Sequence, residues 1–524
     1  MAFVLETTLP LDPARTPSNV TEQLKGIGEQ VGLDLRDVLQ TPSGYFVRAW
    51  ATSRIGASDE RFKEAVQRFV ASALGAFGSP ATTAPGFYDP RIRIRSVHLI
   101  NTKPISDLNL DALERVTVFV GENGSGKTTI LDCIAFFLQQ LSEAIVAGLS
   151  SLGSTPSFPP PQVPVQYLRN GAKVLSIGLD FEVGKEIRSW RLTGEARDED
   201  LAFLVESTAM TEIAESLRAL HTYSPDRPVE LPLVLFYRTN RAVFEVPQRI
   251  RQPHLFSTAE AYDEAVSTDM WQGFRLFFEW FREREDLENE SRLRDPQFRD
   301  KQLQSVRTAL SRILPEFASP HIERAPQRFL IEKRTKAGAE LLEIGQLSDG
   351  EKILFVLAAD IARRLAIANP QSADPLNCYG IILVDEIELH LHPGWQRRIV
   401  ESLLATFPNC QFLLTTHSPQ VVSGSPRNSL RILSDGQAHR FALARGRDTN
   451  SLLEAIFSTP ERPPEFKDHI ARIGALLDSG DFATARTQLE ALSQELSSLD
   501  PDVVRLQTLL HFGDPADETH SKRS

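Results

Sequence analysis

The feature that most constrains this chain is the run GENGSGKT, Gly121 to Thr128, which lies between a short β-branched run and a long apolar segment. VTVFV (116–120) is typical of a buried strand, and the segment after the run has apolar residues at helical spacing. Strand, glycine-rich loop, lysine and helix in this order predict a phosphate-binding loop. Its glycines would let backbone amides face a polyphosphate, and the helix N-terminus would add partial positive charge.

The side chains of this loop indicate a nucleotide site that uses magnesium. Lys127 is expected to reach the β- and γ-phosphates, and Thr128 to place its hydroxyl on Mg²⁺. The strand and helix on either side argue against a glycine-rich turn that binds nothing. The predicted ATP-binding residues are Gly121, Glu122, Asn123, Gly124, Ser125, Gly126, Lys127, Thr128 and Thr129.

A second run, IILVDE (Ile381–Glu386), supports the same chemistry. Four apolar residues predict a buried strand, and Asp385 follows at its carboxyl end, where open α/β sheets bind ligands. We expect Asp385 to hold Mg²⁺ and Glu386 to polarise the attacking water as a general base. Two unrelated carboxylates at a strand end are the alternative, which the first motif makes much weaker.

Composition limits the class of protein. The chain has 524 residues, of which 41% are apolar and 24% charged, as in globular proteins of several domains. Its net charge of −12 disfavours a surface covered in nucleic acid. The N-terminus lacks the pattern of a secretory signal, no apolar run is long enough to cross a bilayer, and three cysteines form no disulfide framework. We therefore expect a cytoplasmic protein with no membrane partner.

The order of apolar strands and helices predicts an α/β fold built from several parts. In the first part we expect strands at 3–9 and 45–52 and helices at 20–39 and 60–77. The predicted parts are a small N-terminal α+β unit (1–77), a linker (78–90), a lobe with the phosphate loop (91–197), a mainly helical insertion (198–345), a second lobe (346–445), a C-terminal helical segment (446–515) and a tail (516–524).

A third signal separates classes of ATPase. LSDGEK (347–352) precedes the Asp-Glu pair, and FLLTTHSP (412–419) follows it. This order resembles the ABC-type ATPase head of the chromosome-maintenance (SMC), Rad-fifty-like, RecF-like and OLD-like proteins. The resemblance implies a P-loop NTPase head that works as a homodimer, and it implies that His417 contacts the γ-phosphate and the attacking water.

The same resemblance gives LSDGEK a role across the dimer. It implies that Ser348 and Gly350 cap the γ-phosphate of the opposite subunit from a helix N-terminus. The common pattern is LSGGQ, so Asp349 and Glu351 depart from it, and an acidic Asp349 near phosphate would weaken ATP-driven closure. The alternative for this segment is an ordinary helix cap.

Two further segments have less certain roles. His390 and His392 suggest a metal site, yet no nearby residue completes a tetrahedral set. The resemblance instead implies a D-loop at the subunit interface, with Glu388 and His390 relaying signals between the two ATP sites. For the Gln-loop, which also contacts Mg²⁺ in ABC-type ATPases, Gln166 is the first candidate and Gln162 the second.

A closer resemblance covers about 91–512. It rests on LFYRTNRAV (235–243), FFEWFREREDLENE (277–290), QLSDGEKILFVLAADIARRLAIANP (346–370), VDEIELHLHPGWQRR (384–398) and FPNCQFLLTTHSPQVV (407–422). These runs resemble the PtuA-type ATPases of Septu and retron-linked anti-phage systems. The resemblance implies an ATPase that senses or regulates and controls a partner nuclease, often of the HNH type. A RecF-like or Rad-fifty-like DNA-repair ATPase and a nucleotide-gated scaffold remain alternatives.

Contact with nucleic acid is left open by the sequence. Arginines cluster with Phe244 in one segment and alternate along a predicted strand in another, and either set could bind phosphates or pair with nearby acids. The first set is Arg238, Arg241, Arg249 and Arg251, and the second is Arg91, Arg93 and Arg95. No nuclease domain is expected after His417, because that segment reads as mostly helical. The stretch 277–295 predicts an amphipathic helix with core aromatics.

Overall fold

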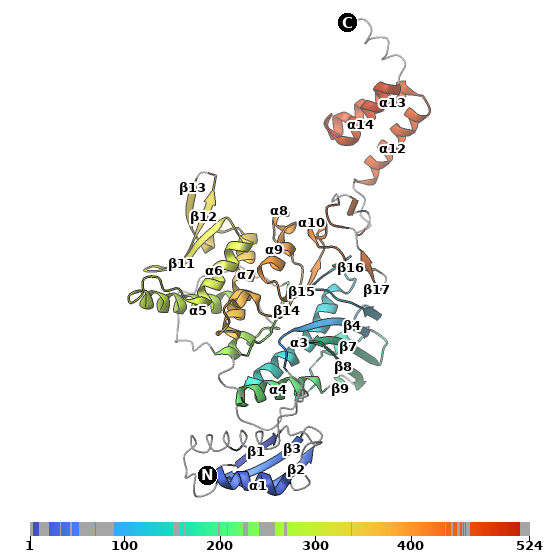
Figure 1. Ribbon diagram of the computed structural model, residues 1–524. Coiled ribbons are helices and arrows are strands. Elements are labelled where there is room, and N and C mark those ends of the chain that lie inside the picture. The colour runs from blue at the N-terminus through green and yellow to red at the C-terminus, as the bar shows by residue number, and fades with distance from the viewer. Residues whose placement is uncertain are drawn as a thin grey trace. The chain divides into compact units, whose positions relative to one another are not determined.

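The computed structural model of the chain is shown in Figure 1. It describes residues 4–9, 20–31, 33–41, 44–51, 69, 88–149, 158, 160–161, 163–197, 200–206, 208–223, 229–239, 257–266, 270–336, 338–434, 436–441, 444–447, 451–452, 454, 456 and 462–513. The chain divides into two compact units, Met1–Gly446 and Arg447–Ser524, and each is described by itself.

A six-stranded sheet forms the centre of the first unit. Its strands run in the order β10-β14-β15-β6-β16-β17, parallel except for β17. All residues of β6, β10, β14 and β15 are buried, as expected of parallel strands covered on both faces. The bounds are β6 Val116–Gly121, β10 Leu233–Tyr237, β14 Gly380–Val384, β15 Cys410–Thr416, β16 Leu430–Ser434 and β17 Gln437–Phe441.

A second, antiparallel sheet has the order β5-β4-β7-β8-β9. Helix α3 (Lys127–Leu149) contacts β6, β10 and β15 of the first sheet and β4 and β7 of the second, so it lies between the two. By length and composition α3 could cross a membrane, but two thirds of its most apolar window is buried inside the protein, which is typical of a core helix. The strand bounds are β4 Ile92–Thr102, β5 Ile105–Leu110, β7 Val174–Val183, β8 Glu186–Arg197 and β9 Asp200–Glu206.

The region 198–345 is only partly the helical insertion that the sequence predicts. Helices α4 (Ala209–Tyr223), α5 (Met270–Arg292) and α6 (Lys301–Ile313) are present, and the aromatics of α5 from Phe274 to Phe281 are buried, as predicted. The prediction is wrong over 200–206, 317–324, 327–335 and 338–343, which are strands. There β11 (Phe317–Arg324), β12 (Gln327–Thr335) and β13 (Gly338–Glu343) form an antiparallel sheet. Their burial does not alternate from residue to residue, so the sequence lacks the period-2 pattern that predicts a strand.

Helix α7 (Asp349–Ala368) joins this region to the parallel sheet through buried charges. Asp360 accepts hydrogen bonds from Arg363 Nη2 at 2.6 Å, from Arg364 Nε at 3.0 Å and from the Tyr237 hydroxyl at 2.9 Å. Burial raises the pKa of Asp360, but the two guanidinium groups and these hydrogen bonds outweigh it, so the net pKa is lowered. The carboxylate therefore stays ionised in the core.

The N-terminal segment forms a small antiparallel sheet of order β1-β3-β2 with one helix. The elements are β1 Val4–Leu9, α1 Val20–Val31, β2 Leu33–Thr41 and β3 Gly44–Ala51. The helix predicted over 20–39 is wrong beyond Val31, where β2 begins after Gly32. Leu33 and Leu35 are both buried, and this i, i+2 spacing fits a strand. The helix predicted at 60–77 falls outside the described residues, apart from Phe69.

The second unit is a three-helix cluster, α12 (Pro464–Asp478), α13 (Phe482–Leu496) and α14 (Pro501–Gly513). Its core includes Ile473, Leu489, Leu492 and Leu506. These three helices fall within the C-terminal helical segment predicted at 446–515, while the tail 516–524 is outside the described residues. The first unit also contains α8 Pro393–Gln396, α9 Ile399–Thr406, α10 Pro419–Gly424, η1 Val165–Tyr167, η2 Thr258–Tyr262, η3 Ile344–Gln346 and η4 Pro375–Asn377.

Candidate active site

The register of the parallel sheet brings both predicted motifs to one edge. Val384 of β14 is paired with Leu414 of β15, and Thr416 of β15 is paired with Val120 of β6. Since the three strands are parallel, the residues after β14 and β15 and the loop after β6 leave the sheet on the same side. Segments far apart in the sequence thus meet at the carboxyl edge, as the sequence predicts.

The phosphate loop has the backbone that its glycines permit. Gly124 and Gly126 adopt φ angles of +80° and +98°, which L-residues with a side chain rarely adopt. A Cβ on Gly121 would lie 2.6 Å from the Leu433 carbonyl oxygen, so β16 packs directly against the loop. Helix α3 begins at Lys127, and its first turn faces the cavity described below.

Asp385 is held by hydroxyl groups from both neighbouring segments. The Thr128 hydroxyl lies 3.0 Å from Asp385 Oδ2, across 257 residues of sequence. The Thr415 hydroxyl donates to Asp385 Oδ1 at 2.5 Å and accepts the Glu386 backbone N–H at 2.7 Å. Glu386 has a φ of +47°, uncommon for a residue with a side chain, so the chain turns sharply just after the strand. One threonine therefore positions both carboxylate residues.

Glu388 fixes the position of His417. Its carboxylate accepts the Thr416 hydroxyl at 2.7 Å and the His417 backbone N–H at 2.6 Å. The two segments are therefore joined by two side chain to backbone contacts. The Thr415 hydroxyl accepts the Glu386 N–H, and the Glu388 carboxylate accepts the His417 N–H. Glu388 was expected to act at a subunit interface, and the described contacts show that it also orients the histidine segment within one chain.

These residues surround a cavity of about 410 Å³. Its lining is made by the phosphate loop, the Asp-Glu pair and the histidine, with one residue from the β4–β5 turn. The lining residues are Pro104, Asn123, Gly124, Gly126, Lys127, Thr128, Thr129, Asp385, Glu386 and His417. Of the predicted loop residues, Gly121, Glu122 and Ser125 do not line it.

Burial lowers the pKa of the two basic side chains in the cavity, Lys127 and His417. Lys127 is buried and donates to the carbonyl oxygens of Gly121 and Glu122 at 2.9 and 2.8 Å. Burial lowers the pKa of Lys127, and the nearby carboxylates oppose the shift. Burial and the charge of Lys127 also lower the pKa of His417, so its imidazole is neutral near pH 7. A neutral imidazole can donate to a phosphate oxygen while its second nitrogen accepts from water.

The signature segment, LSDGEK (347–352), begins helix α7. Ser348 is its N-cap: its hydroxyl accepts the Glu351 N–H at 3.4 Å, and Glu351 accepts the Ser348 N–H at 2.9 Å. Glu351 is also paired with Lys333 at 2.6 Å. The helix cap that the sequence offered as an alternative is thus present. Ser348 and Asp349 are exposed and do not line the cavity of their own chain.

Gly350 shows why the signature segment requires a glycine. A Cβ at this position would lie 2.5 Å from the His390 carbonyl oxygen. The N-terminus of α7 therefore packs on the backbone of the predicted D-loop, where His390 has a φ of +62°. His392 Nδ1 accepts the Gly394 N–H at 3.2 Å as the cap of α8. No cluster of three or more His, Cys, Asp or Glu suited to a metal is found among the described residues.

Gln166 is not brought to the cavity. It lies on η1, its side chain is exposed, and it is not among the lining residues, so the structure gives no support to its magnesium role. Its neighbour Tyr167 instead donates to Asp132 of α3 at 2.7 Å. Gln162 is outside the described residues.

Three of the predicted cationic residues pair with acids. Arg238 lies 2.5 Å from Asp132, and Arg91 and Arg95 pair with Asp89 and Glu182. Arg241, Arg249 and Arg251, with Phe244, are outside the described residues.

Thr415, which contacts both Asp385 and Glu386, was not predicted from the sequence. The signal was present in FLLTT, where an apolar strand ends in two hydroxyl residues beside a motif of carboxylates. The sequence alone does not show which carboxylate these hydroxyl groups contact, because that depends on the pairing of β14 with β15.

Comparison with known proteins identifies the family. A profile of the family described as "AAA domain, putative AbiEii toxin, Type IV TA system" matches residues 116–423, from the first strand of the site to α10. The chain is also 30% identical over 484 residues to the "Retron Ec83 probable ATPase" of Escherichia coli, covering 80% of this chain and 86% of that protein. The chain belongs to this AAA-domain family.

Further relatives agree with the predicted resemblance. The "Retron Vc95 probable ATPase" of Vibrio cholerae serotype O1 biovar El Tor is 29% identical over 429 residues, 71% of this chain and 80% of that protein. The Septu protein PtuA of Bacillus mycoides (strain KBAB4) is 39% identical over 95 residues, 18% of this chain and 12% of that protein. The resemblance to retron-linked and PtuA-type ATPases is thereby confirmed.

Solved structures give a general likeness. The SMC head domain from Thermotoga maritima matches with a TM-score of 0.35 and 16% identity, covering 67% of this chain and 99% of that domain. The chain has an α/β fold, and the AAA-domain family to which it belongs implies nucleotide binding.

Proposed function

We propose that this AAA-domain protein hydrolyses ATP with Mg²⁺ in the cavity at the carboxyl edge of the parallel sheet. The observation that carries the proposal is the 3.0 Å contact of Thr128 with Asp385, in one cavity with Lys127 and Glu386. A hydroxyl and a carboxylate side by side are the oxygen ligands that Mg²⁺ takes in nucleotide sites. The ion, bound there with ATP, would neutralise phosphate charge.

The chain's own residues supply the remaining steps. The amides of the phosphate loop and Lys127 bind the phosphates and stabilise the charge that develops during transfer. Glu386 lies at the cavity wall, on a turn held by Thr415, and orients the attacking water and takes its proton. His417, neutral near pH 7 and held by Glu388, contacts the γ-phosphate.

We further propose that two copies form the complete site. The exposed Ser348 and Asp349 stand at a helix N-terminus, where amides favour an anion, yet they do not line their own cavity. In a head-to-tail homodimer they would face the γ-phosphate of the partner. Because Gly350 packs closely on His390, binding of that phosphate at the N-terminus of α7 would shift the D-loop.

We propose that the chain acts in the cytoplasm in anti-phage defence, and the names of its relatives support the defence role. Two are named as retron ATPases and a third as a Septu protein. We propose that ATP binding and hydrolysis change the dimer and thereby control a partner nuclease of the HNH type. To test this part, the tagged chain is expressed with the products of adjacent genes and purified with and without ATP. Recovery of a nuclease that depends on ATP would support the proposal.

Phosphate release tests the enzymatic part. Lys127→Ala should lose ATP binding, whereas Glu386→Gln should still bind ATP, release phosphate at least about a hundredfold more slowly and accumulate dimers in size-exclusion chromatography. Glu401→Gln is the matched control, since Glu401 is exposed and outside the cavity. Turnover of Glu386→Gln equal to that of the control would remove Glu386 from the mechanism.

A further inference from the structure

A second and larger cavity, of about 820 Å³, lies in the insertion between α5, α6 and the β11–β12 sheet. Four arginines and two glutamates line it, in a chain whose net charge is −12. None of these residues belongs to the ATP site. The charges on its wall decide what it can bind.

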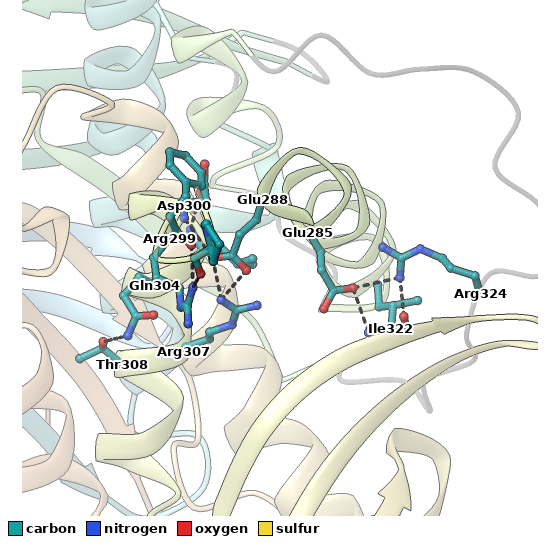
Figure 2. Close-up of polar contacts among 12 residues, drawn as sticks. Glu285, Glu288, Arg299, Asp300, Gln304, Arg307, Thr308, Ile322 and Arg324 are labelled. Carbon is teal, nitrogen blue, oxygen red and sulfur yellow. Dashed lines mark hydrogen bonds and ion pairs between the residues drawn. The ribbon is translucent and has the colours of Figure 1, made fainter. Parts of the chain in front are cut away.

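Both glutamates are used by partners inside the protein. Glu288, whose side chain is 1% exposed, accepts Arg307 Nη1 at 2.9 Å and the Asp300 N–H at 3.0 Å. Glu285 accepts Arg324 Nη1 at 2.9 Å and the Ile322 N–H at 3.1 Å. Figure 2 shows these two groups of contacts, one around Glu288 and one around Glu285. Neither carboxylate is left to neutralise another cation.

The other three arginines have no acidic partner. Arg292 ends α5, Arg299 precedes α6 and Arg334 lies on β12, and all three are exposed. Within the described part of the chain, no carboxylate lies at ion-pair distance from any of them. Arg299 donates only to the backbone carbonyls of Phe298 and Pro296, at 2.7 and 3.3 Å, which leaves its charge uncompensated.

Three guanidinium groups from three elements around one cavity repel one another, and an anion that contacts them together relieves this repulsion. Neutral donors share the wall with them, namely Gln304, Thr308 and Ser311. We propose that this cavity binds phosphate groups, supplied by a free polyphosphate or nucleotide or by a strand of nucleic acid.

Phosphate fits this wall better than a carboxylate. Each guanidinium offers a planar fork of N–H donors that matches two oxygens of one anion. A carboxylate has two oxygens in one plane and is satisfied by one fork, whereas a tetrahedral phosphate accepts forks from several directions. The volume lies in the range of pockets that hold small ligands. Phe298, next in sequence to Arg299, is 38% exposed and offers an aromatic face on which a base of a strand can stack.

The test uses the full-length chain carrying Lys127→Ala, which weakens binding at the phosphate loop and so separates the two sites. Sodium tripolyphosphate is titrated by calorimetry, and a labelled single-stranded oligonucleotide by fluorescence anisotropy. Added to this background, Arg292→Ala, Arg299→Ala and Arg334→Ala should each weaken binding about tenfold. For the oligonucleotide, each change should also lower the slope of log affinity against log salt by about one.

Arg427→Ala is the matched control, because Arg427 is exposed, has no ion pair among the described residues and does not line the cavity. It should leave binding unchanged, and thermal unfolding should show that all five variants fold, namely the three single arginine variants, the triple variant and the control. If the triple arginine variant binds neither probe, and tripolyphosphate displaces the oligonucleotide from its parent, the site is assigned to a strand of nucleic acid. Arginine-dependent binding of tripolyphosphate alone would assign it to small phosphates.

Two results would overturn the proposal. One is a triple variant that binds both probes within twofold of its parent. The other is binding of a polyglutamate peptide in the absence of binding of either phosphate probe. Neither result depends on whether the first cavity hydrolyses ATP, so the two proposals fail separately.

Discussion

Thr415→Val is the most informative single change in the proposed ATP site. Valine keeps the size and branching of threonine but replaces the hydroxyl with a methyl group. The hydroxyl donates to Asp385 Oδ1 at 2.5 Å and accepts the Glu386 N–H at 2.7 Å, so the change removes both contacts without altering the strand. No residue of the phosphate loop is touched.

The magnitude follows from the two lost hydrogen bonds. A hydrogen bond to a charged group contributes about 1.5–3 kcal/mol, and a buried N–H left without a partner costs about 1–3 kcal/mol. Asp385 keeps the contact with Thr128, so part of its position survives. We therefore expect about 2 kcal/mol less stabilisation of the transition state, which is roughly a thirtyfold lower kcat. ATP affinity should change little, because Thr415 does not line the cavity.

Phosphate release under saturating ATP gives kcat, and binding of a fluorescent ATP analogue gives affinity. Thr415→Ser keeps the hydroxyl and should retain most of the activity, while thermal unfolding separates a loss of activity from a loss of fold. Thr415→Val with a kcat within twofold of wild type would refute the argument that this hydroxyl positions Asp385 and Glu386.

Three further predictions concern packing and charge. Gly350→Ala should lower the free energy of unfolding by about 1–3 kcal/mol in urea titrations, since its Cβ would meet the His390 carbonyl at 2.5 Å; an unchanged midpoint would contradict this. Arg307→Ala should cost about 3–5 kcal/mol because it leaves the buried Glu288 unpaired, whereas Arg299→Ala should cost almost nothing; equal effects would refute the distinction. Asp360 has a lowered pKa in the folded state, so its ion pairs stabilise the fold above the unfolded pKa of about 3.9 and are lost as pH falls through the lower folded value. The stability difference between wild type and Asp360→Asn should therefore shrink below about pH 4, and a constant difference would contradict the linkage.

The sequence predicts strands β6 and β14 and the phosphate loop for a local reason. VTVFV and IILV are continuous apolar runs that only a strand covered on both faces can bury, and GENGSGKT requires backbone angles that glycine permits. The relation between Lys127, Asp385 and His417 was also predictable, because carboxyl ends of parallel strands meet at one edge.

Features decided by pairing between distant segments were not predictable. The residues of β2 fit a helix as well as a strand until β3 pairs with them. The short apolar run of β12 lacks the alternation of a strand, and only its pairing with β11 and β13 defines it as one. Thr415 gains its role only when β15 lies beside β14. The second cavity is assembled from α5, α6 and β12, whose arginines look like ordinary surface residues in the sequence.

A structure of Glu386→Gln bound to ATP and Mg²⁺ tests the central proposal most directly. The proposal predicts a dimer in which each triphosphate lies on Lys127 and the Thr128–Asp385 pair of one chain, with Ser348 of the other chain at its γ-phosphate. A triphosphate bound away from Thr128 and Asp385, or with no second chain near it, would contradict the proposed site.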